Sequence, residues 1–117
     1  MQVAEKTREL VAALKQSDVY LEYKRQLKRV RENPELYHRV NEYRNEGFAL
    51  RNDPSEEGAL ARQEAYVQRY QDILSQPVVE DFLAAELALC RKMQEIERTL
   101  VDGIDFDFGG IELKFEK

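Results

Sequence analysis

The chain has 117 residues, of which 43% are hydrophobic and 35% charged, with a formal net charge of -5 and a single cysteine. This length suits one compact domain, and one cysteine excludes an internal disulfide or a multi-cysteine metal site within one chain. No apolar run approaches the roughly 18 residues that span a bilayer, and the amino terminus is charged where a signal peptide would be apolar. We therefore expect a cytoplasmic protein without membrane insertion.

The charge is distributed unevenly along the chain. Residues 1–51 carry 11 Lys and Arg against 8 Asp and Glu, whereas residues 52–117 carry 7 against 15. A general nucleic-acid-binding protein is usually basic overall, so the acidic second half argues against that class. A local basic contact stays open.

The first half of the chain is predicted to form three helices, over about 2–15, 18–32 and 34–51. Apolar residues recur there every three or four positions, which is the period of a helix with one buried face. Ser17 offers a side-chain oxygen to cap the second helix. Asn33-Pro34 should end that helix and begin the third, because Pro disfavours helical geometry in the preceding residue and fits the first helical turn. The predicted buried faces are Val3, Thr7, Leu10, Val11 and Leu14, then Tyr20, Tyr23, Leu27 and Val30, then Leu36, Val40, Tyr43, Phe48 and Leu50.

A fourth helix is predicted over about 55–74, after a loop at the tip of a helical hairpin. Asp53 can cap this helix and Glu56 can reach back to complete a capping box. Gly47 falls on the apolar stripe of the preceding helix, where Gly costs about 1 kcal/mol of helix propensity. The sequence therefore predicts either a close helix crossing at Gly47 or a simple weak point. The predicted apolar face of the fourth helix is Leu60, Tyr66, Val67, Tyr70, Ile73 and Leu74.

A long fifth helix should start after Ser75-Gln76-Pro77, with Ser75 as its cap, and end at Gly103. One stripe of this helix holds Val79, Phe82, Leu89, Met93, Ile96 and Leu100, with Glu86 as its one polar member. A stripe this long is suited to packing against other helices. A carboxylate on it must be paired, protonated or at an edge, since burial of an isolated charge is costly. Glu86 has either a structural partner across the bundle or a functional contact in an interface.

The carboxyl-terminal segment changes its period. Apolar and polar residues alternate from Ile104 to Phe115 on both sides of Gly109-Gly110, which predicts a β-hairpin with a two-residue turn. An isolated hairpin is marginal in water, so we expect it to dock on the bundle or on a second subunit. The alternative is a tail that only a partner orders. The predicted architecture is all-α, a five-helix antiparallel bundle or hairpin array over residues 1–103, followed by this hairpin-like tail at 104–117.

No residues stand out as catalytic, metal-binding or cofactor-binding. The one histidine, His38, is best explained as a surface residue, and Cys90 as a buried thiol beside the apolar stripe. The tail carboxylates Asp105, Asp107 and Glu112 are best explained as solvated, and Gly109-Gly110 precedes no helix that could bind phosphate.

The second helix carries a basic face made of Lys24, Arg25, Lys28 and Arg29, with Arg31 nearby. Such a face can contact RNA phosphates or an acidic partner. The alternative is a solvated face, and Glu22 and Glu32 dilute the charge.

Taken in order, these landmarks resemble the YlbF/YmcA family of small helical bacterial proteins. The resemblance covers about residues 3–104 and is carried by the stretches LVAALKQSDVYLEYKRQLKRVRENPEL, VNEYRNEGFAL and LSQPVVEDFLAAELALCRKMQEIERTL. Gln76-Pro77 stands where the family often has Asn-Pro. The family consists of all-helical, often self-associating proteins. Some are non-catalytic subunits of a complex that steers a membrane-bound endoribonuclease in Gram-positive bacteria, and so affect competence, sporulation and biofilm formation. Members linked to iron-sulfur clusters use several cysteines, and this chain has only Cys90, so no cluster is carried over.

The sequence thus favours a non-enzymatic helical regulator or scaffold without cofactors that forms homo-oligomers, such as a homodimer, or hetero-oligomers with relatives. The alternative is an RNA-binding accessory protein that uses the basic face of the second helix. The interface candidates are Glu86, Phe106, Phe108, Ile111, Leu113 and Phe115.

Overall fold

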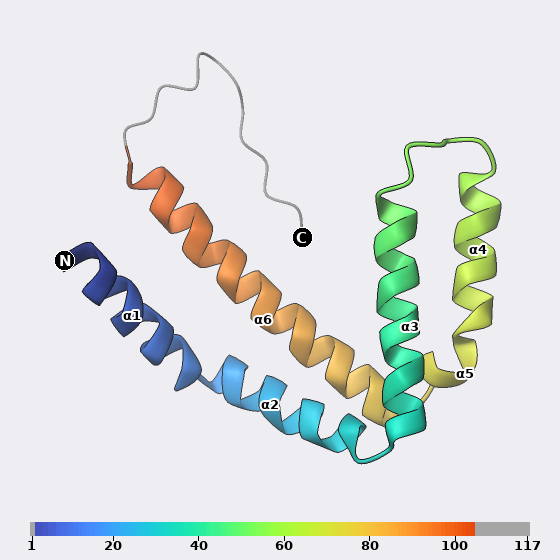
Figure 1. Cartoon of the computed structure of the whole chain (residues 1–117), viewed down its shortest axis with the longest axis horizontal. Coiled ribbons are helices and arrows are strands. Elements are labelled where there is room, and N and C mark those ends of the chain that lie inside the picture. Colours follow the sequence, from blue (N-terminus) through green and yellow to red (C-terminus); the bar gives the residue numbers. More distant parts are fainter. Residues whose placement is uncertain (1, 105–117) are drawn as a thin grey trace. The chain divides into compact units, whose positions relative to one another are not determined.

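The computed structural model describes residues 2–104, and helices joined by short connections make up this part of the chain (Figure 1). They are α1 (Gln2–Lys15), α2 (Asp18–Arg31), α3 (Pro34–Arg51), α4 (Ala59–Arg69), α5 (Gln71–Leu74) and α6 (Pro77–Asp102). The all-helical class is confirmed for these residues. The hairpin predicted over 104–115 lies outside the described residues, apart from Ile104.

The chain divides into two compact units. The first, which we call the terminal unit, contains residues 2–24 and 84–104 of the described chain. The second, the central unit, contains residues 25–83. Both α2 and α6 contribute residues to each unit.

Three of the predicted helix boundaries are confirmed, two of them by side-chain caps. The Tyr20 amide donates to Oγ of Ser17 at 3.3 Å, directly before α2. The Leu36 amide donates to Oδ1 of Asn33 at 3.2 Å, and Pro34 begins α3. α6 ends at Asp102, so Gly103 follows its last residue. Each of the two caps accepts a hydrogen bond from a first-turn amide that has no acceptor inside its own helix.

The predicted fourth helix is wrong in its start and its continuity. α4 begins at Ala59, after Gly58, whose φ of 71° lies in the left-handed region that favours glycine. Asp53 does not cap it, because Oδ1 of Asp53 accepts from the Ser55 amide at 2.9 Å and turns the loop instead. The helix is also interrupted at Tyr70, with φ of -109° and ψ of 10°, so that α5 is separate.

The start of the long helix also differs from the prediction. Ser75 is the C-cap of α5, and its hydroxyl donates to the Asp72 carbonyl at 3.3 Å. The Gln76 carbonyl accepts from the amides of Val79 and Glu80, both at 3.0 Å. The cap predicted at Ser75 is therefore one residue too early.

The hydrophobic core lies in the central unit. Among the described residues, the buried apolar side chains other than Ala85 are Leu27, Val30, Leu36, Val40, Tyr66, Tyr70, Ile73, Val79 and Phe82. All nine belong to the stripes predicted from the sequence. Val30, Val40, Val79 and Phe82 are the largest of the fully buried side chains.

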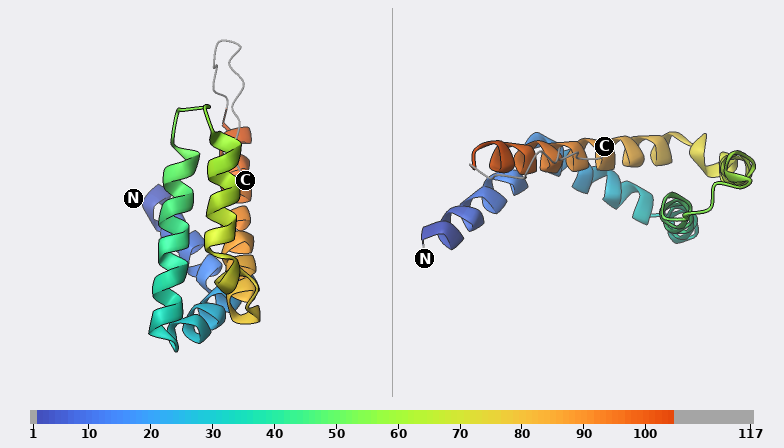
Figure 2. Two further views of the ribbon diagram at one scale, coloured as in Figure 1. Left: turned by 90° about the vertical axis from the view of Figure 1, so that its right-hand side faces the viewer. Right: turned by 90° about the horizontal axis from the view of Figure 1, so that it is seen from above.

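The α3–α4 hairpin of the central unit is held by three tyrosines. α3 and α4 run side by side in opposite directions (Figures 1 and 2). The Tyr43 and Tyr66 rings stack with centroids 5.0 Å apart, and Tyr70 meets both rings edge-on. The Tyr66 hydroxyl donates to the Tyr43 carbonyl at 2.6 Å. A Cβ at Gly47 would overlap this hydroxyl, so the close crossing predicted at Gly47 is the correct alternative.

Charged pairs reinforce the same hairpin. Arg39 donates to Oδ1 of Asp72 at 2.9 Å and its guanidinium lies over the Tyr70 ring. Arg69 pairs with Glu46, and Glu46 also accepts from the Tyr70 hydroxyl at 3.0 Å. Burial raises the pKa of Tyr66, and burial together with the nearby Glu46 raises the pKa of Tyr70.

Candidate protein-interaction surface

The long apolar stripe of α6 is buried only at its start. Val79 and Phe82, in the central unit, have no exposed surface. Further along the same stripe, in the terminal unit, Met93 is 47% exposed and Leu100 is 59% exposed. The sequence predicts packing along the whole helix, but the second half of this stripe is only partly covered, since Leu89 and Ile96 are half-buried.

The apolar face of α1 is also uncovered. None of the 14 residues of α1, all within the described chain, is buried, although the sequence predicts a buried face there. Val3 is 76% exposed, and Leu10 and Val11 are more than 40% exposed. A helix of about 12–15 residues is marginal by itself, because helices gain most of their stability from packing an apolar face. α1 therefore carries a face that suits a further packing partner.

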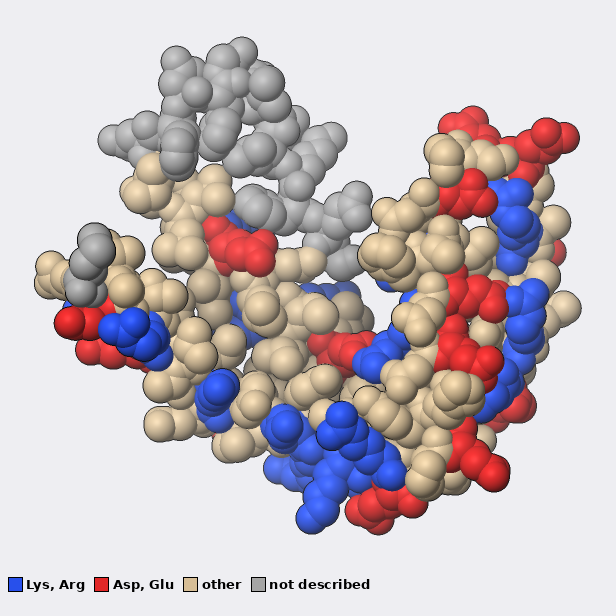
Figure 3. All heavy atoms as spheres, viewed as in Figure 1, with Lys and Arg blue, Asp and Glu red and all other residues tan. Residues whose placement is uncertain are grey.

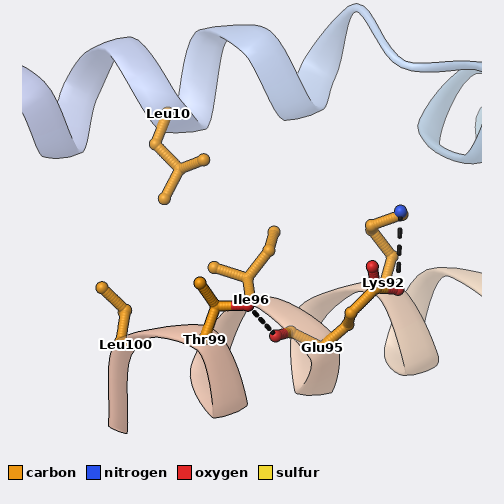
Figure 4. Close-up of a pocket in the computed structure, with 6 residues that line it drawn as sticks. All are labelled: Leu10, Lys92, Glu95, Ile96, Thr99 and Leu100. Carbon is orange, nitrogen blue, oxygen red and sulfur yellow. Dashed lines mark hydrogen bonds and ion pairs between the residues drawn. The ribbon is translucent and has the colours of Figure 1, made fainter. Parts of the chain in front are cut away.

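A groove lies between α1 and α6 within the terminal unit. Its volume is about 260 Å³, and its apolar lining comes from Leu10, Ile96 and Leu100. Figure 4 shows Leu10 pointing from α1 toward α6, with Ile96 pointing back toward it. Lys92, Glu95 and Thr99 also line it; Nζ of Lys92 lies 3.5 Å from Oε2 of Glu95, and the Thr99 hydroxyl donates to the Glu95 carbonyl at 3.0 Å. An apolar groove with a few polar groups is suited to binding an apolar side chain.

Of these groove residues, Leu10, Ile96 and Leu100 lie on helix faces that the sequence predicts to be packed. The sequence carries no signal for the uneven burial of α6, because the three-four spacing of apolar residues is the same in its buried and its exposed half. The prediction of Glu86 as an interface residue is untested; the structure places it half-buried on α6, in the terminal unit. The other interface candidates, Phe106, Phe108, Ile111, Leu113 and Phe115, lie outside the described residues.

His38 and Cys90 are the two single residues whose side chains could carry chemistry. His38 is exposed, as predicted, with Nε2 3.7 Å from Oε1 of Glu42. Cys90 is exposed on α6, so its predicted burial is wrong. The reason is that Cys90 lies beside the stripe rather than on it, on a part of α6 where the stripe residue Met93 is itself 47% exposed. In the described chain, no three His, Cys, Asp or Glu residues lie together in a way that could hold a metal ion.

Comparison with known proteins identifies the family. Residues 3–105 match the family described as "Control of competence regulator ComK, YlbF/YmcA". The chain belongs to the YlbF/YmcA family. It is also similar to a UPF0342 protein of Caldicellulosiruptor bescii, with 25% identity over 100 residues and 84% of each chain covered. No solved structure matches the chain.

Membership in the YlbF/YmcA family confirms the resemblance derived from the helix landmarks. The family description is that of a regulator, and the matched range includes both the central unit and the α1–α6 groove. Within residues 2–104, no helix is long and apolar enough to cross a membrane.

The basic face of α2 is the second surface that the sequence singles out in this family member. Lys24, Arg25 and Lys28 are exposed, and Figure 3 shows Lys and Arg side chains gathered over α2. Arg29, however, donates to Oδ2 of Asp81 at 3.1 Å and to Oε1 of Gln26 at 2.6 Å. This pairing leaves Arg29 less available to a phosphate than its position on the helix suggests.

Arg31 is also engaged locally. Its guanidinium lies over the Tyr37 ring, 5.3 Å from the centroid. Its hydrogen bond to Tyr37 lowers the pKa of that phenol. The basic face available to a partner is therefore narrower than the five cations that the sequence places on or near it.

Proposed function

We propose that this chain is a non-catalytic regulatory protein of the cytoplasm that self-associates and binds protein partners through the apolar surface of its terminal unit. The observation that supports this most is the uncovered apolar surface of α1 and of the second half of α6. Large exposed apolar patches on soluble proteins generally mark interaction sites. A second copy or a family relative would bury this surface.

The family supports the regulatory part of the proposal, since its description concerns control of a competence regulator. The more specific role that we propose is that of an accessory subunit in an assembly that controls an endoribonuclease, with effects on competence, sporulation and biofilm formation. Glu86 and the tail residues Phe106, Phe108, Ile111, Leu113 and Phe115 are proposed contacts in such assemblies.

Self-association is tested by light scattering coupled to size-exclusion chromatography. We expect the wild-type chain to have a mass above that of one copy, and Met93→Asp to lower it while the far-ultraviolet circular dichroism stays unchanged. Leu60→Asp is the matched control, because Leu60 is 74% exposed on α4 of the central unit. A monomeric wild-type chain, or a Met93→Asp chain of unchanged mass, would contradict self-association through this surface.

The partner is tested by affinity purification from the native host, with and without nuclease. Recovery of an endoribonuclease or of family relatives in both samples supports the proposed assembly. Recovery of no protein other than the chain itself contradicts the accessory-subunit role and leaves a homo-oligomer.

A second candidate function is RNA binding, favoured by the cations gathered over α2 in Figure 3. Contacts with phosphates release counterions, so such binding weakens steeply as salt rises. Reversal of Lys24, Arg25, Lys28 and Arg29 to Glu should then abolish RNA retention on a filter at low salt. If the unaltered chain retains no RNA at low salt, this function is excluded.

A further inference from the structure

We propose that the groove between α1 and α6 is the docking site of the chain's own tail, with Phe106 and Phe108 as the side chains that enter it. This inference gives Phe106 and Phe108 an intramolecular partner in place of the intermolecular contact proposed above. It leaves the exposed residues Met93, Val3 and Val11, which do not line the groove, to a second copy. It starts from an apolar groove lined by Leu10 of α1 and by five residues of the last turns of α6, shortly before the tail.

The lengths of the groove and of the first predicted strand agree. The α6 residues that line the groove extend from Lys92 to Leu100, which is about 12 Å at about 1.5 Å per helical residue. An extended strand from Ile104 to Phe108 spans about 13 Å at about 3.3 Å per residue. Because Ile104 lies about 6 Å beyond Leu100, a strand that turns back at Gly103 runs along the groove from Leu100 as far as Ile96 and stops short of Lys92.

The spacing of the apolar residues agrees as well. Measured back from Ile104 along α6, Leu100 is about 6 Å away and Ile96 about 12 Å away. Measured forward along an extended strand, Phe106 is about 7 Å away and Phe108 about 13 Å away. Phe106 thus comes opposite Leu100 and Phe108 opposite Ile96.

The groove also has a suitable size. A cavity of about 150 Å³ accepts one benzene ring. The groove, at about 260 Å³, therefore has room for one phenyl ring and a large part of a second.

The chain's own tail is favoured over other occupants by its attachment. It begins within five residues of Leu100, and a short connection of this kind gives an effective concentration in the millimolar range. The strict alternation from Ile104 to Phe115 supplies an apolar face that has no predicted partner of its own. In the sequence, this predicted apolar face follows directly after the end of α6 whose residues line the groove.

Disulfide trapping in the full chain tests this site. In a Cys90→Ser background, Ile96→Cys is combined with Phe108→Cys, and oxidation is followed by intact mass and non-reducing electrophoresis. Glu97→Cys with Phe108→Cys is the matched control, because Glu97 is exposed on the next position of α6, is not part of the groove lining and closes a loop of nearly equal length. Circular dichroism confirms that both variants keep their helices.

We expect the Ile96→Cys pair to close within one chain about tenfold faster than the Glu97→Cys pair, since docking raises the local concentration of the two thiols. Equal rates for the two pairs would overturn the proposal. Disulfide-linked dimers in place of intrachain products would also overturn it, because the groove would then hold the tail of a second copy. Hydrogen exchange on the unsubstituted chain gives a second measurement. Amides of residues 96–102 should exchange more slowly there than in Phe108→Asp, and equal exchange would contradict docking.

Discussion

The crossing of α3 and α4 at Gly47 predicts that the effect of Gly47→Ala reverses sign with the residue at position 66. Gly47 is buried, and a Cβ there would overlap the Tyr66 hydroxyl. That hydroxyl donates to the Tyr43 carbonyl at 2.6 Å, and the two rings are stacked. The added methyl group therefore displaces a ring that is held by both a hydrogen bond and a stacking contact.

The magnitudes decide the direction. In a helix, Ala is favoured over Gly by about 1 kcal/mol. Against this, loss of the Tyr66 hydrogen bond costs about 1 kcal/mol, and an overpacked core costs about 1–3 kcal/mol. Gly47→Ala should thus lower the free energy of unfolding by about 1–3 kcal/mol in the wild-type chain.

Removal of the hydroxyl changes this balance. Tyr66→Phe alone should cost about 1 kcal/mol, because the Tyr43 carbonyl loses its donor. In the Tyr66→Phe chain, the nearest remaining ring atom is Cζ, 3.2 Å from the added Cβ, which a small shift can accommodate. Gly47→Ala should there be neutral or stabilising by up to about 1 kcal/mol.

The assay is a double-mutant cycle of urea unfolding followed by near-ultraviolet circular dichroism, which reports on tyrosines in a chain without Trp. We expect a coupling energy of about 2 kcal/mol between positions 47 and 66, within the range that contacting residues show. Stabilisation of the wild-type chain by Gly47→Ala, or additive effects of the two substitutions, would refute a steric conflict between the added methyl group and the Tyr66 hydroxyl.

Three further predictions concern caps, pH and surface pairs. Asn33→Ala should lower the free energy of unfolding by about 1 kcal/mol, measured by urea unfolding, because the first turn of α3 loses its cap; Asn33→Asp, which keeps an acceptor, is the control. The raised pKa values of Tyr66 and Tyr70 mean that the unfolded chain loses their protons first. Their contribution to the free energy of unfolding is therefore fully present below about pH 10 and is lost as the pH rises above that value. Urea unfolding at a series of alkaline pH values measures this loss, which should be smaller in a Tyr66→Phe chain. Arg29→Ala should cost less than about 1 kcal/mol, because its pair with Asp81 is half-exposed, and a larger loss in thermal unfolding would contradict this.

Most of the helical architecture could be predicted from the sequence, because caps and apolar periodicity are local signals. Ser17, Asn33 and Gly103 each lie at a helix end where local chemistry alone is sufficient. The interruption at Tyr70 could not be predicted, because no Gly or Pro occurs there. Its side chain is instead buried against Tyr43 and Glu46, and these tertiary contacts override helix propensity.

The candidate site could be predicted less well, because periodicity identifies an apolar face without identifying what covers it. The same spacing predicts packing for both Phe82 and Leu100, although Phe82 is fully buried and Leu100 is 59% exposed. Cys90 lies next to this stripe, and its position there wrongly predicts a buried thiol. The tail residues stay a prediction, since they lie outside the described residues.

The contrast within α6 allows a direct test of the division between a core and an interaction surface. Phe82→Ala should lower the free energy of unfolding by about 3–5 kcal/mol, since a fully buried ring leaves a cavity. Leu100→Ala, on the same helix, should lower the free energy of unfolding of the dilute monomer by under about 1 kcal/mol, because the Leu100 side chain is largely exposed and its truncation removes little buried surface. The same Leu100→Ala change should speed hydrogen exchange in the last turns of α6 if the tail docks there. If Leu100→Ala destabilised the chain as much as Phe82→Ala, the terminal unit would contain a core of its own. Its apolar residues would then be core residues and not a binding surface.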